Sequence, residues 1–103
     1  VYNGYKPKNP ASLKTSLSRR FPDNFHKGKM REVKSGDVTM KYRKQIQKDI
    51  EILKSKSYYI DGKLVTEVAW HVYGEVDELV LKFVHSELKR QNVSLKSFMI
   101  VIH

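Results

Sequence analysis

Three charged residues near the start of the chain have types and a spacing that suit phosphate chemistry. Asp23 follows Pro22, and Glu32 and Lys34 are separated by a single residue. Carboxylate oxygens are ligands that Mg²⁺ prefers, and a neighbouring ammonium group can position or activate a water molecule. If residues 32–34 are extended, Glu32 and Lys34 project from one face of a strand, because side chains alternate with a period of two. The trio is therefore a candidate for metal-assisted hydrolysis.

The order Pro-Asp, spacer, Glu-x-Lys is similar to that of the metal-dependent nucleases of the PD-(D/E)xK type. The resemblance implies that Asp23 and Glu32 hold Mg²⁺ and that Lys34 helps the attacking water. In that family the Glu-x-Lys strand is apolar and central, whereas residues 28–37 offer only Met30 and Val33 as apolar anchors. The spacer of eight residues also leaves little room for two strands and a turn. A nuclease is therefore kept as the third interpretation.

Other catalytic and metal-binding chemistry finds little support in the sequence. The absence of cysteine excludes thiolate ligands and a cysteine nucleophile. His26, His71, His85 and His103 are not spaced three or four residues apart, so no zinc site is expected. No serine lies in a Gly-x-Ser-x-Gly turn, and the scattered glycines form no phosphate-binding loop. The primary interpretation therefore contains no catalytic residue, no metal site and no cofactor.

Positive charge is concentrated in the first half of the chain. The net charge is +9, of which residues 1–34 contribute +7, residues 35–56 contribute +3 and residues 57–103 contribute −1. A field of one sign on one side of a small domain attracts polyanions and accelerates their encounter. The distribution favours a non-enzymatic nucleic-acid-binding domain, with DNA preferred over RNA, that anchors phosphates through its basic half.

The predicted nucleic-acid-binding residues are the lysines and arginines of this basic half. They are Lys14, Arg19, Arg20, Lys27, Lys29, Arg31, Lys34, Lys41, Lys44 and Lys48. A plain solubilising surface and contact with another acidic partner remain alternative explanations of the charge. The alternative function is a protein-interaction or dimerisation module with a basic surface. A homodimer or larger assembly would form through the apolar C-terminal strand.

The composition also limits where the protein is expected to act. No apolar run approaches the roughly 20 residues that cross a bilayer. A small domain without cysteine fits a reducing compartment. We therefore expect an intracellular protein of the nucleus, cytoplasm or nucleoid, without membrane contact.

The N-terminal third contains few regular signals. Residues 1–9 are predicted to be a flexible arm, and residues 10–103 a single domain. Asn9 and Pro10 suit a helix start, and Leu13 and Leu17 continue a narrow apolar stripe through Arg20. Residues 22–36 are predicted to form a basic loop, because this segment contains two glycines and few apolar side chains.

The remaining chain has clearer periodicity. Apolar spacing predicts one helix from about residue 35 to Ser55 and another within residues 75–92. Asp61-Gly62 predicts a hairpin turn, and residues 63–73 favour a strand over a helix because they are rich in β-branched and aromatic residues. Residues 98–103 read as a buried strand. The expected fold is a small α+β domain with two to three helices packed on a short antiparallel hairpin or sheet, with a mostly α fold as the alternative.

Overall fold

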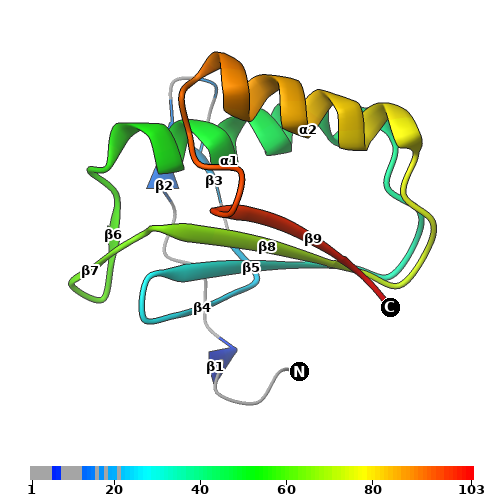
Figure 1. Ribbon diagram of the computed structural model, residues 1–103. Helices are drawn as coiled ribbons and strands as arrows, with labels where there is room; N and C mark the ends of the chain where they lie inside the picture. Colours follow the sequence, from blue (N-terminus) through cyan, green and yellow to red (C-terminus); the bar gives the residue numbers. More distant parts are fainter. Residues whose placement is uncertain (1–5, 8–12, 16, 18, 21) are drawn as a thin grey trace.

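A five-stranded mixed sheet carries two helices on one of its faces (Figure 1), and the predicted α+β class is confirmed. The structure is a computed structural model that describes residues 6–7, 13–15, 17, 19–20 and 22–103. The strands of the sheet, in spatial order, are β1 (Lys6–Pro7), β4 (Asn24–His26), β5 (Lys29–Lys34), β8 (Glu67–Val72) and β9 (Phe98–Ile102).

The pairings divide the sheet into two parts. β1, β4 and β5 are joined by antiparallel pairs, whereas β5, β8 and β9 run parallel. Parallel neighbours require a crossover connection, which is usually a helix. Here α1 (Arg43–Ser55), preceded by the 3₁₀ turn η1 (Met40–Tyr42), joins β5 to β8, and α2 (Glu78–Arg90) joins β8 to β9. The parallel centre was not predicted from the sequence.

The core lies between these helices and the sheet. Its largest fully buried side chain is Trp70 on β8, which Val68 and Val72 flank on the same face. Ile46 and Ile50 of α1 pack into the same cluster, and so do Val80, Val84 and Leu88 of α2. Asp77 caps α2, since its Oδ1 accepts the Leu79 amide at 3.0 Å.

Residues 22–36 are not the predicted basic loop, because most of them form the β4–β5 hairpin. Lys27 (φ 48°) and Gly28 (φ 85°) turn the chain between the two strands. Positive φ at both central residues is the signature of a type I′ turn, whose twist matches that of the flanking strands. A Cβ on Gly28 would approach the Leu64 carbonyl oxygen to 2.5 Å, so glycine is required there on two grounds. This two-residue turn makes room for both strands within a short segment.

The predicted N-terminal helix is also wrong for the residues that the structure describes. β2 (Leu13–Lys14) pairs antiparallel with β3 (Arg19–Arg20), so this segment is extended where the leucine spacing suggested a helix. The predicted arm falls mostly outside the described residues, but Lys6 and Pro7 pair with β4. The helix expected from residue 35 begins later, at Arg43, after the extended Thr39 and the η1 turn.

The second half follows the prediction closely. Asp61 (φ 49°) and Gly62 (φ 75°) turn the hairpin of β6 (Tyr59–Ile60) and β7 (Lys63–Leu64). Residues 67–72 form a strand, and the C-terminal run pairs with it as β9. Within the described ranges, neither helix has the length and apolar character needed to cross a membrane.

Candidate functional site

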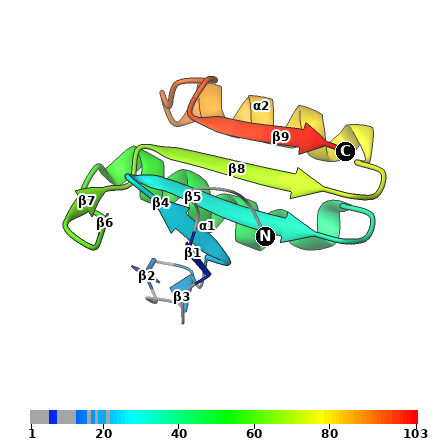
Figure 2. The ribbon, with the colours of Figure 1, turned by 90° about the horizontal axis from the view of Figure 1, so that it is seen from below.

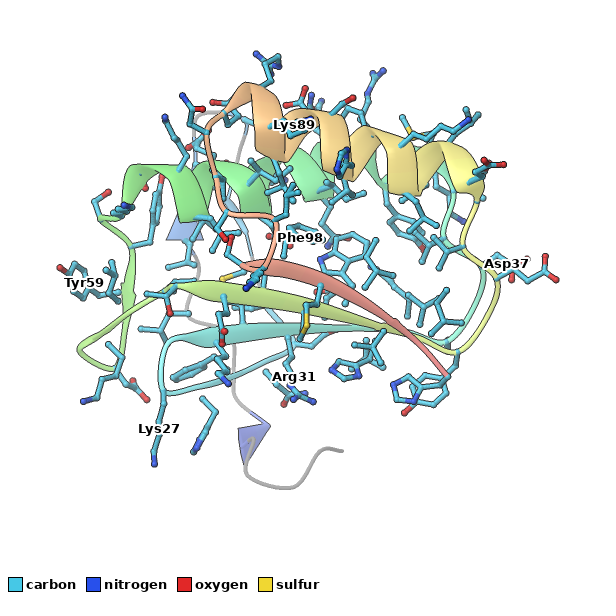
Figure 3. The ribbon with its side chains drawn as sticks, in the orientation of Figure 1. Lys27, Arg31, Asp37, Tyr59, Lys89 and Phe98 are labelled. Carbon is cyan, nitrogen blue, oxygen red and sulfur yellow. The ribbon has the colours of Figure 1, made fainter. Side chains whose placement is uncertain are left out.

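The Glu-x-Lys segment lies on β5, with β4 on one side and β8 on the other. Met30 belongs to the core cluster, so alternation places Glu32 and Lys34 on the same, helix-covered face. Arg31 projects from the opposite face, away from the helices (Figure 3). The strand therefore has the central position that its sequence did not suggest.

Asp23 lies immediately before β4 and beside the Glu-x-Lys segment. The β4–β5 register pairs Asn24 with Arg31, and one further step of the same register places Asp23 opposite Glu32. The Asp23 carboxylate accepts the Val33 amide through Oδ2 at 2.9 Å. Asp23 is exposed, whereas Glu32 is only 5% exposed. Asp23 and Glu32 thus occupy neighbouring positions on adjacent antiparallel segments, one in solvent and the other buried.

Glu32 and Lys34 form an ion pair that is almost completely removed from water. Lys34 Nζ lies 2.8 Å from Glu32 Oε2, and the side chains of Lys34 and Glu32 are 14% and 6% exposed. Burying two charges costs several kcal/mol per ion, and replacing such a pair with apolar residues is often neutral or stabilising. Stability alone therefore gives no reason to retain these charges in a central strand.

Two aromatic rings hold Lys34 in place. Its Nζ lies 4.3 Å from the ring centroid of Tyr42 and 5.3 Å from that of Trp70. The two rings meet edge-on, with centroids 6.0 Å apart and an interplanar angle of 82°. Trp70 is anchored in turn, since its Nε1 donates a 2.9 Å hydrogen bond to Oδ2 of the buried Asp49. Tyr42 and Trp70 are called the aromatic brace below.

Gln45 is a further polar group on the same side of α1. It follows Tyr42 by three residues and precedes Asp49 by four, so the three side chains share one helix face. That face is directed at Lys34 and Trp70 through Tyr42 and Asp49. The Gln45 Oε1 atom is buried and accepts no hydrogen bond from the part of the chain that the structure describes. It is an unused acceptor on the helix face that carries Tyr42 and Asp49.

The donor set limits how a metal ion could bind here. Among the described residues, no three His, Asp or Glu side chains gather closely enough to hold a metal ion. Asp23 and Glu32 supply two carboxylates at most. Mg²⁺ suits such a site, because it usually keeps several of its waters and binds proteins through one or two carboxylates.

No family model, curated protein or solved structure matches this chain. The functional assignment therefore depends on the geometry of the chain's own residues.

The predicted basic residues are divided among several parts of the surface. Lys41, Lys44 and Lys48 lie along η1 and α1 and are spaced three and four residues apart, so they share one side of the helix. This side carries Gln45 as well. The basic ridge, defined as Lys41, Lys44 and Lys48, therefore borders the face of α1 that covers Lys34.

The other predicted residues do not join this ridge. Lys27 is exposed in the β4–β5 turn. Lys29 and Arg31 belong to β5, where Lys29 pairs with Glu67 at 3.2 Å and Arg31 projects from the open face of the sheet. Lys14, Arg19 and Arg20 lie on β2 and β3, and their side chains are outside the described part of the structure. The ten residues remain a prediction; among them, Lys34 and Lys41 of the ridge both lie near the Tyr42 ring.

A histidine pair occupies the open face of the sheet. His71 Nδ1 lies 2.9 Å from His103 Nε2, and the ring of His103 stacks on that of Tyr73 with centroids 4.4 Å apart. Burial lowers the pKa of His71 below its ordinary value, and the nearby charges of Arg31 and His103 lower it further. His71 is therefore held in its neutral form in the folded chain.

This lowered pKa predicts a loss of stability in mild acid. The unfolded chain binds a proton at His71 near the ordinary pKa of 6.5, whereas the folded chain resists it. The free energy of unfolding should be highest at pH values above this ordinary pKa. It should decrease as the pH falls toward the lower pKa of His71 in the folded chain. Urea unfolding between about pH 7.5 and about pH 5 measures how steeply the free energy of unfolding depends on pH. This dependence should be weaker in His71→Gln and unchanged in His26→Gln. An equal pH dependence in the wild type and both variants would contradict the role given to His71.

Tyr42, Gln45 and Trp70 were not predicted as site residues. Trp70 is fully buried in the core, and Tyr42 is half-buried against it. The only sequence signal for Gln45 is its position three residues after Tyr42 on the predicted helix. Their relation to Lys34 depends on the β5–α1–β8 crossover, which residue spacing does not reveal.

Proposed function

We propose that the chain is a Mg²⁺-dependent nuclease domain whose reactive groups are Asp23, Glu32 and Lys34. The observation that carries the proposal is the buried Glu32–Lys34 ion pair on a central strand, with the Asp23 carboxylate beside it. Stability gives no reason for this arrangement, whereas nucleases of the type that the sequence resembles use a lysine and two carboxylates close together around Mg²⁺. Two features of the topology support the proposal: β5 is an inner strand of the sheet, and the two-residue turn fits both β4 and β5 into the short spacer.

The residues present fit a magnesium ion. Asp23 and Glu32 come from adjacent antiparallel positions, and oxygen donors of this type and number match the preference of Mg²⁺. When bound, Mg²⁺ supplies a Lewis acid that stabilises charge on the phosphate and lowers the pKa of a coordinated water. The Val33 amide, which donates to Asp23 Oδ2, fixes the orientation of that carboxylate.

Lys34 is the residue that would act on the attacking water and on the phosphate. Its ammonium carries three donors, of which the bond to Glu32 uses one. The aromatic brace limits the directions in which the others can point. Gln45 Oε1 can accept a hydrogen bond from the same water or from the substrate. The basic ridge beside this face would neutralise phosphates of the bound strand.

The test is cleavage of supercoiled plasmid DNA by the purified chain. We expect nicked and linear products with Mg²⁺ and none after chelation by EDTA. Asp23→Asn should reduce the rate at least about 10²-fold, because the amide oxygen is a weaker metal ligand than a carboxylate. The matched control is Asp61→Asn in the β6–β7 turn, where asparagine tolerates the positive φ and cleavage should be unchanged.

Two results would overturn the proposal that the chain is a nuclease. One is the absence of Mg²⁺-dependent cleavage of duplex DNA, single-stranded DNA and RNA alike. The other is an undiminished rate in Asp23→Asn. Salt-sensitive binding without cleavage would instead support the non-enzymatic nucleic-acid-binding domain, in which each phosphate contact adds about −0.9 to the log–log slope of affinity against salt.

A further inference from the structure

β9 forms one edge of the sheet and has a free side. In the strand order it pairs only with β8, and no other described strand lies along its outer side (Figure 2). Phe98–Ile102 contains no charge, proline or glycine, which are the usual devices that prevent an edge from pairing with another chain. This edge is therefore open to a further strand.

The hydrogen bonds to β8 reveal which residues of β9 face outward. Val68 donates to the Ser97 carbonyl at 2.7 Å, and His103 donates to the Val72 carbonyl at 2.9 Å. In a parallel ladder the bonding residues alternate, so the odd-numbered residues of β9 bond to β8. The amides and carbonyls of Phe98, Ile100 and Ile102 are consequently directed to the free side.

The side chains at this edge are apolar and accessible. Met99 is 53% exposed and Ile102 58% exposed. Phe98 lies between α2 and the sheet (Figure 3), and a groove of about 200 Å³ runs between α2 and β9. Leu81 and Leu95 line the groove, and both remain exposed. A partner strand would continue both the backbone ladder and this apolar layer.

The charges of α2 indicate what kind of partner fits. At about 100° per residue, Glu78, Leu81, His85 and Lys89 follow one another along the side of α2 above β9. An acid thus lies at one end of this row, a base at the other, and leucine and histidine between them. In an antiparallel arrangement with an identical helix, each Glu78 comes opposite a Lys89 and each Leu81 comes opposite a His85. The row is complementary to its own copy.

We propose that the protein forms a two-fold symmetric dimer through antiparallel pairing of β9 with β9 of a second copy, centred on Ile100. This register pairs Phe98 with Ile102 of the other copy and uses every outward amide and carbonyl of the strand. A two-fold interface must be self-complementary, as this one is. The strongly cationic β4 side lies at the opposite edge of the sheet, so the two cationic halves stay apart. The dimer does not depend on the proposed nuclease.

Sedimentation equilibrium of the purified chain over a range of concentrations measures the association. We expect a dimer, and Ile102→Lys should be monomeric because it places two charges in the shared ladder. Lys89→Glu should weaken the dimer about tenfold, since it sets a second carboxylate opposite Glu78 at both symmetry-related contacts. Adding Glu78→Lys to Lys89→Glu should restore wild-type affinity, because the exchanged row is again complementary to its copy.

The control is Leu79→Lys, which alters another exposed leucine on the other side of α2 and should leave the dimer unchanged. Circular dichroism confirms that each variant is folded. A monomer at about 100 μM would overturn the proposal, since a specific interface of standard size binds much more tightly. Failure of the double exchange to recover the affinity lost in Lys89→Glu would also overturn it.

Discussion

Glu32→Gln should lower the rate of Mg²⁺-dependent DNA cleavage by about 10²–10³-fold or more, because it removes one of two carboxylates available to the metal. Lys34→Met should have a comparable effect by removing the ammonium from the site. Single-turnover cleavage at saturating DNA and Mg²⁺ measures the chemical step without the contribution of binding. A rate within about threefold of wild type in either variant would show that the ion pair is not catalytic.

The same variants should separate activity from stability. Each single replacement leaves the remaining member of the pair buried without its ion-pair partner, which costs about 3–5 kcal/mol in the free energy of unfolding. The double variant Glu32→Gln/Lys34→Met buries neither charge, so it should be more stable than either single variant while remaining inactive. Urea unfolding followed by the fluorescence of Trp70 gives the free energy of unfolding of the two single variants and of the double variant. A double variant as unstable as the worse single variant would contradict this account.

The Glu87–Arg90 ion pair provides a matched control on α2. Arg90 Nη2 lies 2.7 Å from Glu87 Oε2, and the side chains of Arg90 and Glu87 are 64% and 14% exposed. Because the Arg90 end of the pair is in solvent, the pair should contribute about 0–1 kcal/mol, as surface pairs do. Glu87→Gln/Arg90→Met should therefore change stability by no more than that and leave cleavage unchanged.

The second half of the fold could be predicted because its local signals agree with one another. Asp61-Gly62 has the residues that a type I′ turn requires, and α2 combines an apolar stripe with the Asp77 cap. Each of these features depends on residues close together in the chain. What they could not reveal is that β8 and β9 run parallel to β5, because parallel pairing depends on crossovers rather than turns.

The first half was predicted poorly because buried charges and unusual turn chemistry obscure its pattern. β5 places two charged residues, Glu32 and Lys34, on the face that covers the core, so the expected alternation of apolar and polar residues is absent. Its turn uses Lys27-Gly28, although asparagine or aspartate is usual at the first position. Sequence rules fail most often at functional sites, and β5 is consistent with that expectation.

The candidate trio itself was visible in the sequence, but its setting was not. Asp23, Glu32 and Lys34 are close in the chain, so their types and spacing could be recognised. The aromatic brace was not predicted, since Trp70 is brought to Lys34 only by the β5–α1–β8 crossover. Burial of the ion pair, which carries the functional argument, is a property of that tertiary arrangement alone.

Trp70→Ala should be the most destabilising single substitution in the chain. Trp70 is fully buried on β8 and packs against Tyr42 and Phe98, with ring centroids 6.0 and 6.1 Å away. Removing a buried aromatic ring costs about 3–5 kcal/mol, because it loses transfer free energy and leaves a cavity. A domain of this size is stable by only about 5–15 kcal/mol. The urea midpoint of Trp70→Ala should therefore fall sharply, and a loss under about 1 kcal/mol would contradict the packing described.

Trp70→Phe distinguishes the ring from its N–H group. The phenyl ring retains an aromatic face toward Lys34, but the hydrogen bond to Asp49 Oδ2 is lost, at a cost of about 1–3 kcal/mol for the buried acceptor. If that bond is the main link between the two residues, Asp49→Asn and Trp70→Phe should not be additive, with a coupling of at least about 0.5 kcal/mol in a double-mutant cycle. Cleavage by Trp70→Phe should remain within about tenfold of wild type, since Lys34 still lies near two aromatic rings, those of Tyr42 and of the new phenylalanine. Loss of cleavage equal to that of Lys34→Met would instead mean that the indole N–H, through Asp49, takes part in holding the site.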